Sequence, residues 1–254
     1  MIVLPDIHGR TFWKKAVKDR ENEEIVFHGD YLDPYEEEFI SDEEALENFK
    51  EIIEFKRQHP DNVVLLIGNH DLHYFYPAIE PSSRYCGYLA RDIRKLFIDN
   101  IDLFQLAYEK EIAGKCFVFS HSYIHKLWLN DLYGKGRWRK NSVIKRLNKD
   151  FQKFLYGLGC ALNNVSCYRG GWESYGSMVW ADIREIALFQ KPNIGDYNIF
   201  GHTQLKRPIV TEFKACLDCR RGFLINEEGK ICELNGTEVS LDKKPESEKK
   251  CKFD

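Results

Sequence analysis

Residues 65–71 (LLIGNHD) join an apolar run to a glycine and three consecutive polar side chains. The run belongs to a strand pattern over 62–67 that is continuous in Val, Leu and Ile, as in a central strand covered on both faces. Packing gives no reason to place Asn69, His70 and Asp71 at the end of such a strand. A metal site or an acid/base site needs such groups held rigidly at the edge of a sheet. The stretch therefore predicts an α/β sheet with a functional site at its edge.

The same arrangement recurs at four other places in the chain. Helix patterns separate the first three strand patterns, and the clearest helix starts at the capping box SDEE (41–44). Strands that alternate with helices and end in acidic residues and histidines are typical of an open α/β sheet with a site along one edge. The four further strands are predicted at 1–4, 24–27, 115–120 and 197–200, and they run into PDIHG (5–9), HGDYLD (28–33), HS (121–122) and GHTQ (201–204).

Periodicity predicts the remaining elements. Short strands near the C-terminus are expected to form an all-β closing segment. Helices are predicted at 11–20, from 41 onward, at 85–100 and at 142–158, and strands at 106–112, 209–213, 215–218, 222–225 and 231–234.

The composition is that of one globular domain. With 254 residues, of which 43% are hydrophobic and 30% charged, the chain can bury a sizeable core. We expect one domain over residues 1–235, with an insertion at about 123–180 that caps the site, and a charged tail over 236–254. The net charge of −3 is too small to indicate a nucleic-acid or membrane partner.

Two further features bear on the compartment. The sequence shows no leader and no run of about 18 apolar residues, so a cytoplasmic location without a membrane partner is expected. Its eight cysteines are scattered, which suits a reducing compartment. Cys216-x-x-Cys219 lacks the second pair that a zinc ribbon requires.

The polar groups at the strand ends form a ligand set without thiolates. Carboxylate, amide and imidazole ligands suit manganese, iron or zinc. The set exceeds what one ion needs and suffices for two ions, the arrangement that activates a shared water in phosphoryl transfer. Its members are Asp6, His8, Asp30, Asp33, Asn69, His70, His121 and His202.

These motifs, taken in order, resemble those of the calcineurin-like metallophosphoesterases. The match covers Asp6-x-His8, Gly29-Asp30-x-x-Asp33, Gly68-Asn69-His70-Asp71, His121 and Gly201-His202-Thr203. Each motif is weak alone, but five in the right order at predicted strand ends form a specific signal. The resemblance implies an α/β fold, a four-layer α-β-β-α sandwich of two mixed sheets with a dinuclear metal site at the strand carboxyl ends.

The resemblance also implies a role for each matched residue. His70 would be the general acid that protonates the leaving oxygen, and Asp33 would fix its tautomer. A hydroxide that bridges two divalent ions (Mn, Fe or Zn) would attack phosphorus in line. The metal ligands implied are Asp6 and His8 for the first ion, Asp30 for both, and Asn69, His121 and His202 for the second.

Departures from the family patterns bear on the substrate. Gln204 stands where many phosphodiesterases of the superfamily carry a second histidine. This resembles the branch of serine/threonine protein phosphatases and symmetrical dinucleoside tetraphosphate hydrolases, as do the stretches VWAD (179–182) and CLD (216–218). That branch has arginines where this chain has Pro34 and the pair Leu72-His73. The residues expected to bind the phosphate instead are Arg169, with Arg137 and Arg84 behind it, and His73.

The expected activity is hydrolysis of a phosphomonoester or phosphoanhydride. The substrate would be a phosphorylated small molecule, a nucleotide or a phosphoprotein. One alternative is a phosphodiesterase or nuclease that holds a polyanion on the basic stretch 135–146. A metal-bearing scaffold or nucleic-acid-binding module without catalysis is the other alternative, and the presence of both His70 and Asp33 argues against it.

Overall fold

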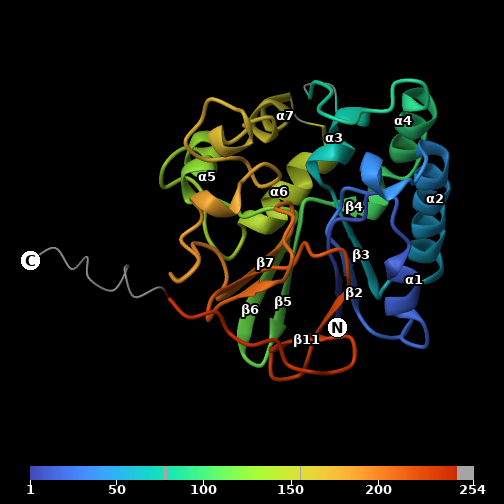
Figure 1. Ribbon diagram of the computed structural model, residues 1–254. Coiled ribbons are helices and arrows are strands. Elements are labelled where there is room, and N and C mark those ends of the chain that lie inside the picture. The colour runs from blue at the N-terminus through green and yellow to red at the C-terminus, as the bar shows by residue number, and fades with distance from the viewer. Residues whose placement is uncertain (77–78, 155, 245–254) are drawn as a thin grey trace, which may run out of the picture.

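The computed structural model describes residues 1–76, 79–154 and 156–244, which build two mixed β-sheets flanked by helices (Figure 1). Within the first sheet, β1 to β4 are parallel to one another, β10 pairs antiparallel with β1, and β11 pairs antiparallel with β10. In the second, β6, β7 and β9 are parallel, with antiparallel edges. The first sheet runs in the order β11 (Ile231–Glu233), β10 (Phe223–Ile225), β1 (Ile2–Leu4), β2 (Ile25–Phe27), β3 (Val63–Leu66), β4 (Phe104–Gln105), and the second β5 (Ala107–Ile112), β6 (Lys115–Ser120), β7 (Tyr197–Phe200), β9 (Lys214–Cys216), β8 (Ile209–Val210).

Alternating side chains on the strands separate the layers. Val3, Val26 and Leu66 point toward the second sheet and pack in one core cluster with residues such as Phe119 and Ile199. Their neighbours on β1 to β3 point the opposite way, into the larger core beneath the helices. Both faces of β1 and β2 are buried, which explains why their sequences are continuously apolar.

Helices cover the outer faces of both sheets. Figure 1 shows α1 (Phe12–Val17), α2 (Asp42–Gln58) and α4 (Ala90–Asp99) on the side of the six-stranded sheet. Helix α2 begins at the predicted capping box, in which Ser41 accepts from the Glu44 amide and Glu44 accepts from the Ser41 amide. On the other side, α6 (Val143–Gln152) packs against β5. The predicted α/β architecture with two mixed sheets is confirmed.

Several predicted elements differ from the structure. The helix expected at 142–158 is two helices, α6 and α7 (Tyr156–Leu162), and Phe154 between them has a left-handed φ of 49° that a continuous helix does not allow. The closing strands are divided, because β8 and β9 join the second sheet and β10 and β11 the first. Residues 69–75 form a helix, α3 (Asn69–Phe75), that the polar stretch did not predict.

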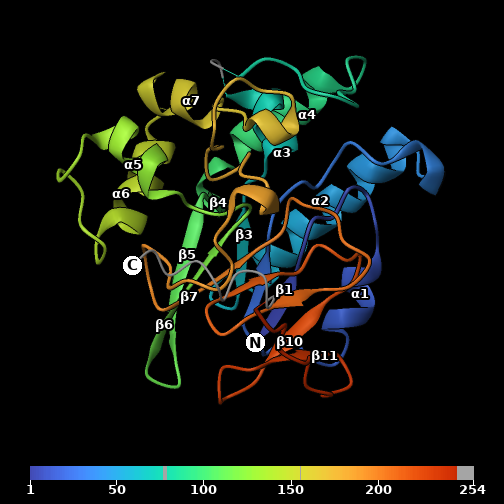
Figure 2. The ribbon, with the colours of Figure 1, turned by 60° about the vertical axis from the view of Figure 1, so that its left-hand side comes forward.

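Further helices lie above the strand ends (Figure 2). They are α5 (Lys126–Tyr133), α7 and the short 3-10 turns Cys167–Arg169 and Ile183–Glu185, all but the last within the predicted insertion at 123–180. Two more 3-10 turns, Glu36–Glu38 and Ile101–Leu103, lie elsewhere in the chain.

The predicted tail begins with residues that still contact the sheets. The Val239 amide donates to the Ile231 carbonyl (2.8 Å), and Asp242 accepts from the Val210 amide (2.9 Å). Residues 245–254 of that tail lie outside the described part. No helix within residues 1–76, 79–154 and 156–244 has both the length and the apolar character required to cross a membrane.

Candidate metal centre

The carboxyl ends of β1, β2, β3, β6 and β7 converge on one buried cluster. The two sheets face each other with these ends at the same side, so segments far apart in sequence meet there (Figure 2). The predicted ligands Asp6, His8, Asp30, Asn69, His121 and His202 all lie in this cluster and are at most 8% exposed.

One half of the cluster contains Asp6, His8 and Asp30. His8 Nδ1 donates to the carbonyl of Leu32 (2.9 Å), so its Nε2 carries the lone pair that faces Asp30 Oδ2 at 3.4 Å. Burial lowers the pKa of His8 to about 3. The imidazole is therefore neutral near pH 7, the form that binds a metal.

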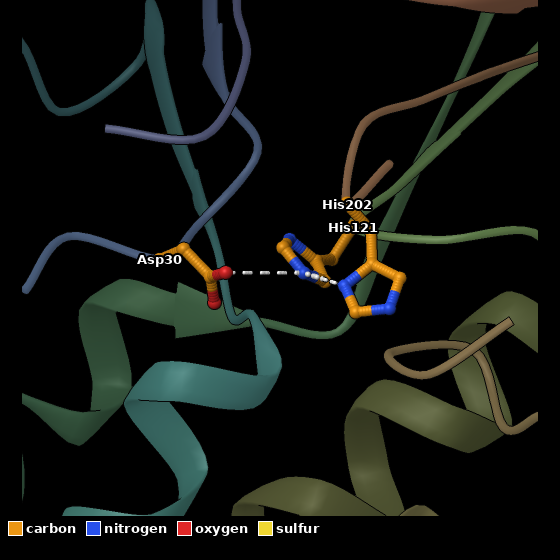
Figure 3. A group of neighbouring side chains, drawn as sticks. All are labelled: Asp30, His121 and His202. Atoms are coloured by element: carbon orange, nitrogen blue, oxygen red, sulfur yellow. Dashed lines mark hydrogen bonds and ion pairs between the residues drawn. The ribbon is translucent and has the colours of Figure 1, made fainter. Parts of the chain in front are cut away.

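The other half contains Asp30, His121 and His202 (Figure 3), together with Asn69, which contacts His121. His121 Nδ1 lies 2.8 Å from the carbonyl of His28, to which it can only donate, so Nε2 is left with a lone pair. That nitrogen lies 3.0 Å from Asn69 Oδ1, 3.2 Å from His202 Nδ1 and 3.5 Å from Asp30 Oδ2. Burial lowers the pKa of His202 as well.

This donor set fits divalent cations. An imidazole lone pair that faces carboxylate and amide oxygens is repelled by them unless a cation lies between, and burial denies these atoms water as a partner. Asp30 belongs to both halves of the cluster, so the arrangement can hold two ions that share this carboxylate. Oxygen and imidazole ligands suit manganese, iron or zinc.

Backbone strain accompanies the site. His8, Asp30, Asp33 and His202 have φ values of 44°, 50°, 58° and 65°, in the left-handed region that L-residues seldom adopt. Such strain persists where the surrounding structure enforces it and is concentrated at functional sites.

Two glycines make room for the carboxylates. A Cβ on Gly68 would lie 2.1 Å from Asp30 Oδ1, and one on Gly201 would lie 2.1 Å from Asp6 Oδ1. Any side chain at either position would displace the carboxylate. The glycines of the motifs are thus required by close contact between neighbouring strand ends.

Backbone amides connect the loops that carry the ligands. The Asp71 carboxylate accepts from the amides of Gly68 (2.8 Å), Asp30 (2.8 Å) and Tyr31 (2.9 Å), so its role is structural. Asp6 accepts from the amide of His202 at 3.0 Å. Each ligand is therefore held by the loop that carries another one.

His70 and Asp33 form a hydrogen-bonded pair beside the cluster. His70 Nδ1 lies 2.7 Å from Asp33 Oδ2, so Nδ1 carries the proton and Nε2 keeps a lone pair. His73 Nε2 is 2.9 Å from the same oxygen, and the Tyr74 hydroxyl donates to Asp33 Oδ1. Burial raises the pKa of Asp33, but the hydrogen bonds from His70 and His73 outweigh it, so the pKa is lowered and Asp33 stays ionised.

The predicted phosphate-binding residues lie in other surroundings than expected. Arg169 is bound to the protein itself, since Nε is 2.8 Å from Asp182 and Nη2 donates to the His202 carbonyl (2.8 Å). His73, also expected to bind the phosphate, is buried in α3 with its Nε2 against Asp33. The exposed Arg137 lies in the loop between α5 and α6, and its described contacts are with Gly134 and Arg146, outside the cluster.

Arg84 lies beside the candidate general acid. Its Nη2 lies 3.0 Å from His70 Nε2, and its guanidinium carbon lies 3.7 Å from the centre of the Tyr35 ring. The sequence placed it behind Arg169, together with Arg137. Tyr74 was missed altogether, although its place three residues after Asp71 on α3 is one turn further along that helix.

Comparisons with known proteins identify the family and proteins of similar fold. The family model of the calcineurin-like phosphoesterases matches residues 2–208. A protein-tyrosine phosphatase of a psychrophilic Shewanella species has a similar structure, with a TM-score of 0.50 and 15% identity over 95% of this chain and 80% of that one. Another structure of a cold-active protein tyrosine phosphatase gives a TM-score of 0.50 at 14% identity, covering 94% and 77%.

A serine/threonine phosphatase of Saccharomyces cerevisiae matches at a TM-score of 0.45 and 14% identity, over 85% of this chain and 65% of that one. No curated protein matches the sequence. Because the family model spans residues 2–208 of 254 and the strand ends carry its motifs, the chain belongs to the calcineurin-like phosphoesterase family.

Proposed function

We propose that this metallophosphoesterase hydrolyses a phosphomonoester or phosphoanhydride with two divalent ions, manganese, iron or zinc. The observation that carries the proposal is the position of Asp30, which belongs to both groups of ligand side chains and also accepts from the His70 amide (2.9 Å). The Asp30 carboxylate thereby holds the backbone of His70, a candidate general acid, at a set distance from the metal ligands.

In this proposal, Asp6, His8 and Asp30 hold one ion, and Asp30, Asn69, His121 and His202 hold the other. Two such ions supply an activated water at neutral pH and neutralise charge on the phosphoryl oxygens. Burial lowers the pKa of His8 and of His202, so these two imidazoles are neutral and can bind a cation without losing protons.

His70 is the proposed proton donor to the leaving oxygen. Asp33 holds its Nδ1–H, so a second proton at Nε2 is stabilised by the ionised carboxylate and can be given to the leaving group. Arg84 donates to the unprotonated Nε2 in the structure. Protonation of Nε2 removes that acceptor and frees the guanidinium for a phosphate oxygen, which is the role we propose for Arg84.

We assign Arg169 a positioning role instead of phosphate binding. Its guanidinium is held by Asp182 and donates to the carbonyl of His202 and to Thr203 Oγ1 (3.0 Å). These bonds fix the loop that presents His202 to the second ion.

The test is hydrolysis of p-nitrophenyl phosphate by the protein loaded with Mn²⁺, compared with its Asp30→Asn variant. We expect turnover by the wild type and a loss of at least a hundredfold in the variant, because both ions lose their shared ligand. Equal inactivity of the two proteins, with two ions bound to the wild type, would support the non-catalytic alternative. Faster hydrolysis of bis(p-nitrophenyl) phosphate than of the monoester would support the phosphodiesterase alternative.

A further inference from the structure

A second pocket lies beside the metal centre, between residues 80–83 and residues 163–173. Its volume is about 580 Å³, within the range of roughly 300 to 1,000 Å³ typical of small-molecule sites. The wall combines two indole rings with amide and hydroxyl side chains, contributed by Trp172, Trp180, Asn163, Asn164, Ser82 and Ser83.

Contacts connect this pocket to the catalytic groups on two sides. The ring centre of Trp180 is 5.6 Å from that of His202, a proposed metal ligand. On the other side, Ser82 Oγ lies 3.0 Å from Nδ1 of His73, whose Nε2 faces Asp33. A group in the pocket is therefore close to both the proposed ligand His202 and the network that orients His70.

Trp172 lies in a loop that is held in place by hydrogen bonds between backbone groups of the loop. The Cys167 amide donates to the Glu173 carbonyl (2.8 Å), and the Gly171 amide donates to the Ser166 carbonyl (3.0 Å). Gly171 packs so closely that a Cβ there would lie 1.9 Å from the Val165 carbonyl oxygen. The indole of Trp172 is nevertheless 98% exposed, so this fixed loop holds a large apolar ring in water.

The charges around the pocket select an uncharged occupant. Glu80 and Glu173 line it, and the guanidinium of Arg169 is already held by Asp182. A further phosphate group would meet two carboxylates without a free arginine among the lining residues. An uncharged aromatic ring with polar edges suits the indoles, amides and hydroxyls instead.

We propose that the pocket binds the nucleoside part of a nucleoside phosphate substrate, with the base stacked on Trp172. This inference rests on the proposed function. In the step it implies, a water oxygen forms a bond to phosphorus and the bond from phosphorus to the nucleoside oxygen breaks. His70 gives its proton to that oxygen, one proton of the water stays on the phosphate and the other restores His70, so the products are a nucleoside and inorganic phosphate.

The test measures adenosine binding and substrate kinetics on wild type, Trp172→Ala and Trp172→Phe. Adenosine should quench tryptophan fluorescence of the wild type, and Trp172→Ala should weaken its binding about tenfold, as loss of one stacking ring does. The KM for adenosine 5′-monophosphate should rise by a similar factor, while the KM for glycerol phosphate stays unchanged. Trp172→Phe should restore most of the affinity. Phe39→Ala, which removes another exposed ring (93%), is the matched control.

The results separate this inference from the proposed function. Adenosine binding that depends on Trp172 supports the pocket even if no phosphate ester is hydrolysed. Turnover of p-nitrophenyl phosphate without adenosine binding, or with equal KM changes for both substrates, overturns it. A Trp172 effect confined to a phosphotyrosine peptide also overturns it, in favour of a protein substrate.

Discussion

Replacement of His70 by asparagine should make the rate depend on the quality of the leaving group. The substitution keeps a polar side chain on α3 but removes the proton that Nε2 would deliver. The His70 amide, which donates to Asp30, is retained, so the metal ligands stay in place. The loss should therefore appear in the proton-transfer step alone.

The expected size follows from the geometry. Asp33 fixes Nδ1–H at 2.7 Å, so His70 is a positioned donor of the kind whose removal costs about 10² to 10⁴ in kcat. A phenyl or alkyl leaving group needs that proton, since its anion is a strong base. A 2,4-dinitrophenyl group leaves as a stable anion, and its hydrolysis should fall by less than about tenfold.

The assay measures kcat for a series of aryl phosphates on wild type and His70→Asn, both loaded with Mn²⁺. A plot of log kcat against leaving-group pKa should be shallow for the wild type and steep for the variant. Equal losses for every leaving group would refute the assignment of His70 as general acid. Metal content measured on the same samples is the control, because it should be the same in both proteins.

Three further predictions concern space, burial and charge at the site. Gly68→Ala should lower the unfolding free energy by about 1 to 3 kcal/mol and weaken metal binding, because the added Cβ would lie 2.1 Å from Asp30 Oδ1. The control is Gly87→Ala, in which the nearest atom to the added Cβ is 4.0 Å away; it should change neither stability nor metal binding. Burial lowers the pKa of His28 to about 3. Below about pH 6.5 the unfolded state therefore binds more protons at this residue than the folded state does. His28 should for this reason lower the unfolding free energy by up to about 1.4 kcal/mol for each pH unit of acidification. His28→Leu should flatten that slope in urea unfolding at pH 4.5 to 7, and an unchanged slope would contradict the account. Arg84→Met should raise KM for p-nitrophenyl phosphate about 10- to 100-fold with unchanged metal content, since it removes a charged hydrogen bond; an unchanged KM would exclude phosphate binding by this residue.

The sequence was most informative where one physical requirement acts on neighbouring residues. Continuous apolar runs such as 25–27 and 63–67 are typical of strands buried on both faces, and each ends in polar groups that packing does not explain. Parallel strands bring those ends to one edge, so the residues of the cluster could be listed before their contacts were known. The capping box at Ser41 was predictable for the same local reason.

The sequence was least informative where contacts join distant segments. Arg84 reaches His70 through a loop without periodicity, and no local pattern distinguishes it from Arg169 or Arg137. His73 was predicted to bind the phosphate, but residues 69–75 form a helix, α3, which directs the His73 side chain inward to Asp33. These residues depend on how loops fold over the sheet edge, which local spacing does not determine.

Metal content is the most direct test of the account. Protein saturated with Mn²⁺, freed of unbound ions and analysed by mass spectrometry of the elements should contain two ions per chain. Asp30→Asn should contain fewer than one, because Asp30 belongs to both ligand groups. The exposed Asp99 on α4 provides a control variant, Asp99→Asn, that should retain two. A wild-type content of one ion, or two ions retained by Asp30→Asn, would contradict a centre built around this shared carboxylate.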